Sequence, residues 1–130
     1  MFLPIINAQS IEIKEISKEI LKKHTTLEIL YFYLDCSRVE KVPFNESFDF
    51  IIDEEGMLKN HKLGYSLPYY PNDFKENVFF GNSTLVKNVE DENGEISWTF
   101  FDNYEELVDI LRKYFQEQKV YKRNIESHLL

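Results

Sequence analysis

Asp53-Glu54-Glu55-Gly56 and Asp91-Glu92-Asn93-Gly94 decide the predicted fold class, because each is an acidic turn ending in glycine. Each lies between two strand-like runs, which are Phe48–Ile52 and Met57–Lys59 for the first turn and Thr84–Val89 and Ile96–Phe101 for the second. A chain that reverses through a type I turn needs a residue with a left-handed backbone, which glycine adopts at little cost. The two turns therefore predict β-hairpin tips on one antiparallel sheet.

Other segments also have the composition of strands. Leu27–Leu34 is rich in aromatic and β-branched residues with apolar side chains on both faces, which predicts a central strand covered by a helix. Phe2–Ile6 predicts an edge or first strand, with Pro4 marking the edge because it has no N–H for a ladder bond. Ser10–Ile16 is ambiguous between strand and helix, and its alternating isoleucines favour a strand that ends near Ile16.

The remaining segments of the sheet region are less regular. Ser37–Ser47 contains proline and asparagine and is interpreted as a loop or a strand edge. Leu63–Asn77 is interpreted as an irregular insert, because glycine and two prolines break any periodicity. Val78–Val89 predicts a strand with a bulge or tight turn at Gly81-Asn82.

Two segments are predicted to be helical. Ser17 is suited to cap a short helix over Ser17–Thr25. Asp102, with a glutamate three residues on, predicts the capping box of a C-terminal helix. The apolar stripe of that helix includes Tyr114 and keeps its spacing through Tyr121 and Ile125, so the helix is expected to project over residues 116–130.

These elements predict an α+β fold in a single domain over residues 1–130. It has an antiparallel sheet of about five strands, two helices on one face and a long C-terminal helix. A chain of this length buries roughly two thirds of its unfolded surface, so it needs no disulfide or metal for stability.

Composition limits the classes of partner. The net charge of −8 repels nucleic-acid phosphates and anionic membranes, so neither is expected to be bound. No apolar run approaches the roughly 20 residues that span a bilayer, and Met1–Ile6 lacks the basic residues of a signal peptide. Because Cys36 is the one cysteine, a reducing compartment, the cytoplasm, is expected.

The sequence supplies no constellation for catalysis. His24, His61, His128 and Cys36 are scattered without the spacing of metal ligands, and no phosphate-binding glycine motif is present. A nucleophilic thiol is disfavoured at Cys36, because the neighbouring carboxylate of Asp35 raises a thiol pKa. We therefore expect no catalytic residue, no metal and no cofactor.

Binding residues are expected in two places. The aromatic insert offers rings that either fold back onto the sheet or contact a partner, which are Tyr65, Tyr69, Tyr70 and Phe74. The C-terminal helix offers the face formed by Tyr114, Tyr121 and Ile125, which either packs on its own sheet or joins a second copy or another protein.

Four segments together resemble a known family. They are LEILYFYL at Leu27–Leu34, IIDEEGMLK at Ile51–Lys59, FGNSTLV at Phe80–Val86, and the acidic turn, strand and helix of Asp91–Phe115. Their order is similar to that in a family of small uncharacterised domains, encoded mainly by bacteriophages and other mobile elements of bacteria. The chain departs from that family at Asn60–Tyr65 and in its basic C-terminal extension. The resemblance implies an accessory protein of the bacterial cytoplasm and carries over no catalytic residue.

The sequence predicts non-catalytic binding to a host protein, for example in counter-defence, with homo-oligomerisation through the C-terminal helix as an additional expectation. Two alternatives stay open. One is a module near Tyr69 and His61 that binds or sequesters a small ligand or nucleotide. The other is an acidic mimic of nucleic acid.

Overall fold

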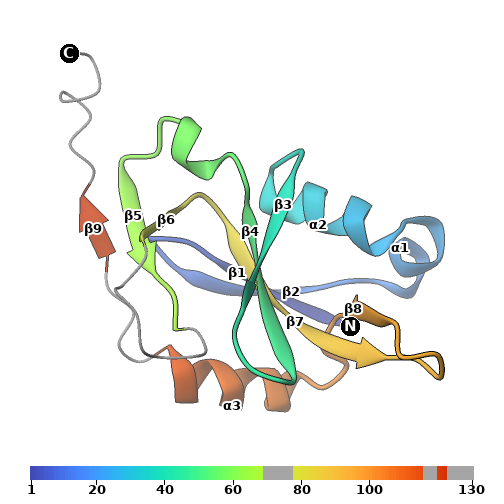
Figure 1. Cartoon of the computed structure of the whole chain (residues 1–130). Helices are drawn as coiled ribbons and strands as arrows, with labels where there is room; N and C mark the ends of the chain where they lie inside the picture. The colour runs from blue at the N-terminus through green and yellow to red at the C-terminus, as the bar shows by residue number, and fades with distance from the viewer. Residues whose placement is uncertain (69–77, 116–119, 123–130) are drawn as a thin grey trace.

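The computed structural model describes residues 1–68, 78–115 and 120–122, and it confirms the predicted α+β class (Figure 1). A large antiparallel sheet runs in the order β2-β1-β7-β4-β3, with β8 also paired to β7. Its strands are β1 (Phe2–Ile6), β2 (Ile11–Glu15), β3 (Val39–Pro43), β4 (Phe48–Asp53), β7 (Ser83–Glu90) and β8 (Ile96–Thr99).

A second sheet and the helices complete the described fold. The small sheet runs in the order β6-β5-β9, with β5 (Leu63–Ser66), β6 (Val78–Phe80) and β9 (Val120–Lys122). The helices are α1 (Lys18–Lys23), α2 (Thr26–Leu34), the single 3-10 turn η1 (Gly56–Leu58) and α3 (Tyr104–Tyr114).

Strand β7 lies at the centre of the large sheet. It pairs with β4 from Ser83 to Lys87, with β1 at Ser83, and with β8 from Lys87 to Glu90. Because successive side chains of a strand point to opposite faces, Leu85 and Val86 enter two different apolar clusters. The large sheet is therefore covered on both faces.

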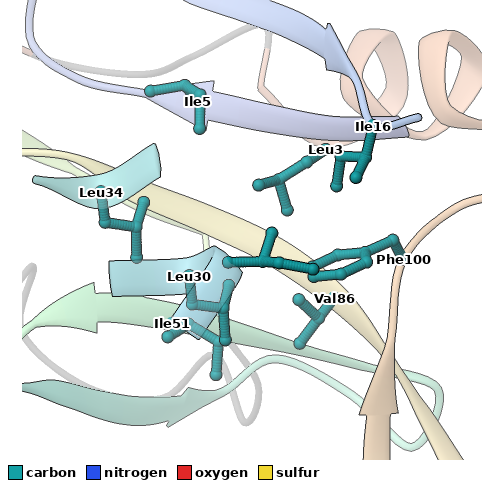
Figure 2. Packing of buried hydrophobic residues seen from close by; sticks show 9 residues of the cluster. Leu3, Ile5, Ile16, Leu30, Leu34, Ile51, Val86 and Phe100 are labelled. Atoms are coloured by element: carbon teal, nitrogen blue, oxygen red, sulfur yellow. The ribbon is translucent and has the colours of Figure 1, made fainter. Parts of the chain in front are cut away.

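The first apolar cluster joins one face of the large sheet to α1 and α2. Figure 2 shows Leu30 and Leu34 of α2 among side chains from the strands, including Ile51 of β4 and Val86 of β7. Ile20 and Leu21 of α1 pack against the same cluster. Both N-terminal helices therefore cover this face of the large sheet.

The second apolar cluster joins the other face to α3 and the small sheet. Phe50 of β4 contacts Phe115 edge to face, with ring centroids 5.7 Å apart. Leu107 of α3 and Tyr65 of β5 are buried in the same cluster. The prediction that both helices lie on one face is therefore wrong. Helix α1 lies beside α2 on one face of the large sheet, and α3 lies on the other face (Figure 1).

The prediction of a strand at Leu27–Leu34 is wrong, because the segment forms helix α2. Thr25 and Glu28 make a capping box, in which each side chain accepts a hydrogen bond from the other residue's backbone N–H. Leu30 and Leu34, four residues apart, are buried, whereas Phe32 is 78% exposed. The composition favoured a strand, but the capping box and the burial of one helix face prevailed.

The first acidic turn is not a hairpin tip. Strand β4 continues to Asp53, and the chain then enters η1, so β4 pairs with β3 and β7 instead of Met57–Lys59. A Cβ atom on Gly56 would lie 2.2 Å from the carbonyl oxygen of Phe80, which explains this glycine by close packing. The second turn is confirmed: it joins β7 to β8, and Gly94 has a φ of +80°.

Pro4 does not mark a sheet edge, because β1 lies between β2 and β7. Strands β1 and β7 share only the ladder pair of Ile6 and Ser83. The hydroxyl of Thr84 donates to the Pro4 carbonyl oxygen beside that pair. At Pro4, a hydrogen bond from the Thr84 side chain therefore takes the place of a backbone ladder bond between β1 and β7. The strand predicted near Ser10–Ile16 is confirmed as β2.

The C-terminal helix is shorter than predicted. Its N-cap is Asn103 instead of Asp102, and it ends at Tyr114. Residues 120–122 form β9 and pair with β5, so they do not continue the helix. The rest of the expected projection, 116–119 and 123–130, lies outside the described residues.

Leu30→Ala and Phe32→Ala test the helical assignment of α2. Residues two apart share one face of a strand but lie on nearly opposite sides of a helix. We expect Leu30→Ala, which removes a fully buried side chain, to lower the free energy of unfolding by about 2–5 kcal/mol. Phe32→Ala should change it by less than about 0.5 kcal/mol. Urea denaturation measures both, and equal losses would contradict the helix.

Candidate functional site

A pocket of about 600 Å³ opens where three connections meet. They are the β1–β2 turn, the link from η1 to β5, and the turn from β6 to β7. We call it the amide pocket, because four of its lining side chains are carboxamides: Asn7, Gln9, Asn60 and Asn82. His61, Lys62 and Gly81 also line it. Its volume falls within the range of small-molecule sites, roughly 300–1,000 Å³.

The carboxamide of Asn7 connects two walls of the pocket. Its Oδ1 accepts hydrogen bonds from the backbone N–H groups of Gln9 and Ser10, at 2.9 and 3.0 Å. Asparagine commonly closes a turn in this way. Its Nδ2 donates to Oδ1 of Asn82 at 3.2 Å. The β1–β2 turn is therefore tied to the β6–β7 turn across 75 residues of sequence.

Gly81 brings the β6–β7 turn close to His61. Its φ of +85° favours glycine, and a Cβ atom there would lie 3.1 Å from Nε2 of His61. That Nε2 atom is buried and has no hydrogen-bond partner. Gly81 therefore places the connection between β6 and β7 directly against the imidazole ring of His61.

The buried side chain of Tyr65 on β5 forms a hydrogen bond with the connection between β6 and β7. Its hydroxyl lies 2.7 Å from the Gly81 carbonyl oxygen, 3.0 Å from Ser83 Oγ and 3.2 Å from the Ile6 carbonyl oxygen. The side chain is 1% exposed, so of the two alternatives for this ring the structure has the one in which it folds back into the core. Burial raises the pKa of the Tyr65 hydroxyl, and the hydrogen bond with Ser83 opposes this rise.

An ion pair holds the link between η1 and β5. Lys59 Nζ lies 2.7 Å from Oδ2 of the buried Asp53, and it also donates to the Asp35 carbonyl oxygen at 3.1 Å. The hydrogen bond with Asp53 raises the pKa of Lys59. Asp53, the first residue of the acidic turn, thus anchors the segment that carries Asn60 and His61.

The charge of the pocket differs from that of the whole chain. The chain carries a net charge of −8, yet the described residues that line the pocket include no aspartate or glutamate. Lys62 is the charged side chain among them. The arrangement therefore offers amide groups and one cation to a ligand.

The residues predicted to bind do not gather in this pocket. Tyr114 of α3 is half-buried and packs edge to face on Phe44, with centroids 4.8 Å apart. Tyr121 lies on β9 opposite Gly64. The other predicted contacts, Tyr69, Tyr70, Phe74 and Ile125, lie outside the described residues.

Sequence reasoning missed Asn7, Gln9 and Asn82 as site residues. It did place an alternative ligand site near His61 and a bulge or tight turn at Gly81-Asn82. The structure has a bend there, with Gly81 at a positive φ, and the bend separates β6 and β7, which belong to different sheets. The overlooked signal is local. Asn7 precedes Gln9 by two residues and Ser10 by three, and its side-chain oxygen accepts from the backbone N–H groups of both.

The described part of the chain offers little support for metal binding or for a nucleophilic thiol. No group of three His, Cys, Asp or Glu side chains there could hold a metal ion. The pKa of the Cys36 thiol is raised, first by burial and then by the Asp53 carboxylate. The direction matches the sequence prediction, although Asp35 contributes least among the causes. A protonated thiol is a poor nucleophile.

Comparisons with protein-family models, curated proteins and solved structures find no match to this chain. The resemblance to phage-encoded domains therefore stays a prediction. Among the described residues, no helix has both the length and the apolar character needed to cross a bilayer.

Tyr65→Phe tests the support beneath the pocket. At neutral pH it should cost about 1–3 kcal/mol, because the Gly81 carbonyl loses its donor. The folded pKa of Tyr65 lies above the unfolded value of about 10, so its contribution to stability is full below pH 10 and is lost as pH rises. Wild-type stability should therefore fall by up to about 1.4 kcal/mol per pH unit more than that of the variant.

Urea denaturation across the alkaline range measures this difference. Tyr104→Phe, at a half-exposed position on α3, is the matched control and should keep the wild-type slope. Equal slopes for Tyr65→Phe and the wild type would contradict the buried, hydrogen-bonded hydroxyl.

Proposed function

We propose that this protein acts by non-catalytic binding and that the amide pocket holds a small polar molecule. The observation that carries the proposal is the convergence of four carboxamides, His61 and Lys62 from three separate connections on one pocket of about 600 Å³. Pockets with a few convergent polar groups are the usual sites of small ligands. This proposal corresponds to the ligand-binding alternative suggested by the sequence.

The walls of the pocket support binding without chemistry. Carboxamides donate and accept hydrogen bonds but do not ionise, so they select a ligand without transferring protons to it. The pocket is also held by internal bonds, such as those of Asn7 and Tyr65, that exist before any ligand arrives. A preformed site loses less conformational entropy on binding.

A thermal-shift screen against nucleotides, nucleosides, sugars and small carboxylic acids tests this proposal. A ligand at 100 times its Kd should stabilise the folded protein by about 2.7 kcal/mol and raise the Tm. Asn82→Ala should reduce the shift, whereas Asn93→Ala, in the β7–β8 turn, should not. If no compound raises the Tm, or if both variants respond alike, the pocket is not the site.

A second candidate is binding to a host protein, as expected for a phage-type accessory protein in the bacterial cytoplasm. A groove of about 350 Å³ lies between α1 and α2, lined by Ile20, Ile29 and Tyr33. Phe32, also in its lining, is 78% exposed. Exposed aromatic side chains beside an apolar hollow are common anchors of protein interfaces.

Affinity capture from bacterial lysate with matched variants separates this candidate from the first. Phe32→Asp should abolish capture of the partner, whereas Ile96→Asp, at another exposed apolar position, on β8, should leave it unchanged. Equal capture by both variants would exclude the groove. Light scattering of the purified protein shows whether the partner is instead a second copy.

A further inference from the structure

We infer that the amide pocket recognises its ligand through an anionic group, a phosphate or a carboxylate. The inference rests on the proposed small-ligand function and deepens it. It follows from the orientation of two carboxamides, which the backbone itself determines, and from the charge of the side chains around them.

The orientation of the Asn7 carboxamide is fixed. One of its terminal atoms lies 2.9 Å from the backbone N of Gln9 and 3.0 Å from that of Ser10. Both backbone groups are donors, so the atom between them must be the acceptor, Oδ1. The usual ambiguity between the oxygen and nitrogen of an asparagine does not arise at this position.

The orientation of Asn82 follows from that of Asn7. Because Nδ2 of Asn7 can only donate, the Asn82 atom 3.2 Å away must be Oδ1. Both carboxamide oxygens are therefore engaged inside the protein. Asn82 retains both N–H donors of its Nδ2 group and Asn7 retains one, whereas Oδ1 of Asn82 retains one acceptor site, so N–H donors outnumber acceptors on these two side chains.

Charge favours the same kind of ligand. Lys62 lines the pocket, and no carboxylate does so among the described residues. The nearby carboxylate of Asp53 has its own cation, Lys59, at 2.7 Å. N–H donors in a pocket that a lysine also lines stabilise oxygen anions, because hydrogen bonds to an ionised acceptor are about twice as strong as neutral ones.

The volume argues for an organic ligand instead of a bare ion. A pocket of about 600 Å³ is much larger than one phosphate or carboxylate group. The remaining lining is mixed, with Gln9, Asn60 and His61 beside Ala8 and Leu63. The ligand class is therefore a small organic molecule that carries a phosphate or a carboxylate.

Asn82→Asp provides a sharp test. The aspartate keeps an oxygen that accepts from Nδ2 of Asn7, so the connection between the two turns remains. It replaces the two N–H donors with a negative charge. Asn93→Asp, in the β7–β8 turn, makes the same change of charge away from the pocket and is the matched control. Lys62→Gln removes the cation alone.

The experiment titrates the isotope-labelled protein and these variants with inorganic phosphate, acetate and uncharged adenosine at constant ionic strength, and follows the amide NMR signals. We expect phosphate or acetate to shift the backbone amide signals of Gly81 and of residue 82, which every variant retains. Asn82→Asp should weaken the affinity at least about tenfold, which corresponds to roughly 1.4 kcal/mol. Asn93→Asp should leave it within about twofold. The stronger of the two anions identifies the ligand group.

Each other outcome is decisive. If adenosine shifts the pocket signals and neither anion does, the inference of an anionic ligand is wrong while the proposed small-ligand function stands. If no compound shifts them, both fail. If an anion shifts them equally in the wild type and in Asn82→Asp, the binding is nonspecific and the inference is overturned.

Discussion

The carboxamide of Asn7 is the constraint on which the site depends. Its oxygen closes the β1–β2 turn by accepting from two backbone N–H groups, and its nitrogen donates to Asn82 of the β6–β7 turn. Two connections that are far apart in sequence thereby form one wall. The hydroxyl of Tyr65 holds the same region from within the second apolar cluster, where it reaches both Ile6 and Gly81. The core thus sets the geometry of the surface pocket.

Local chemistry determined how much of the fold could be predicted. The Asp91–Gly94 turn and the cap at Ser17 were predictable, because each depends on residues next to one another in sequence. Leu27–Leu34 was mispredicted, because its strand-like composition outweighed the capping box of Thr25 and Glu28, and the burial of Leu30 and Leu34 on one side establishes the helix. The hairpin tip predicted at Asp53–Gly56 was also wrong. The prediction explained Gly56 by a left-handed backbone, whereas the structure requires glycine there because Gly56 packs closely on Phe80.

The candidate site was less predictable than the fold, because its residues come from three connections that only the tertiary structure brings together. The aromatic pattern at Tyr65 was compatible with either burial or partner contact, and only the tertiary structure shows that the core buries this ring. The position of Gly81-Asn82 as a turn could be predicted. Its bond with Asn7 could not, because no local pattern links residues 75 positions apart. The charge of the pocket could not be predicted either, since the net charge of −8 does not reveal a pocket whose described lining lacks carboxylates.

A double-mutant cycle between Asn7 and Asn82 tests the central claim most directly. Unfolding free energies are measured for the wild type, Asn7→Ala, Asn82→Ala and the double variant. The loss of the Asn7 turn is the same in both backgrounds, so the coupling energy isolates the bond between the two side chains. The account predicts a favourable coupling of about 0.5–1.5 kcal/mol. Additive losses, with no coupling, would contradict the joined wall and with it the pocket that it forms.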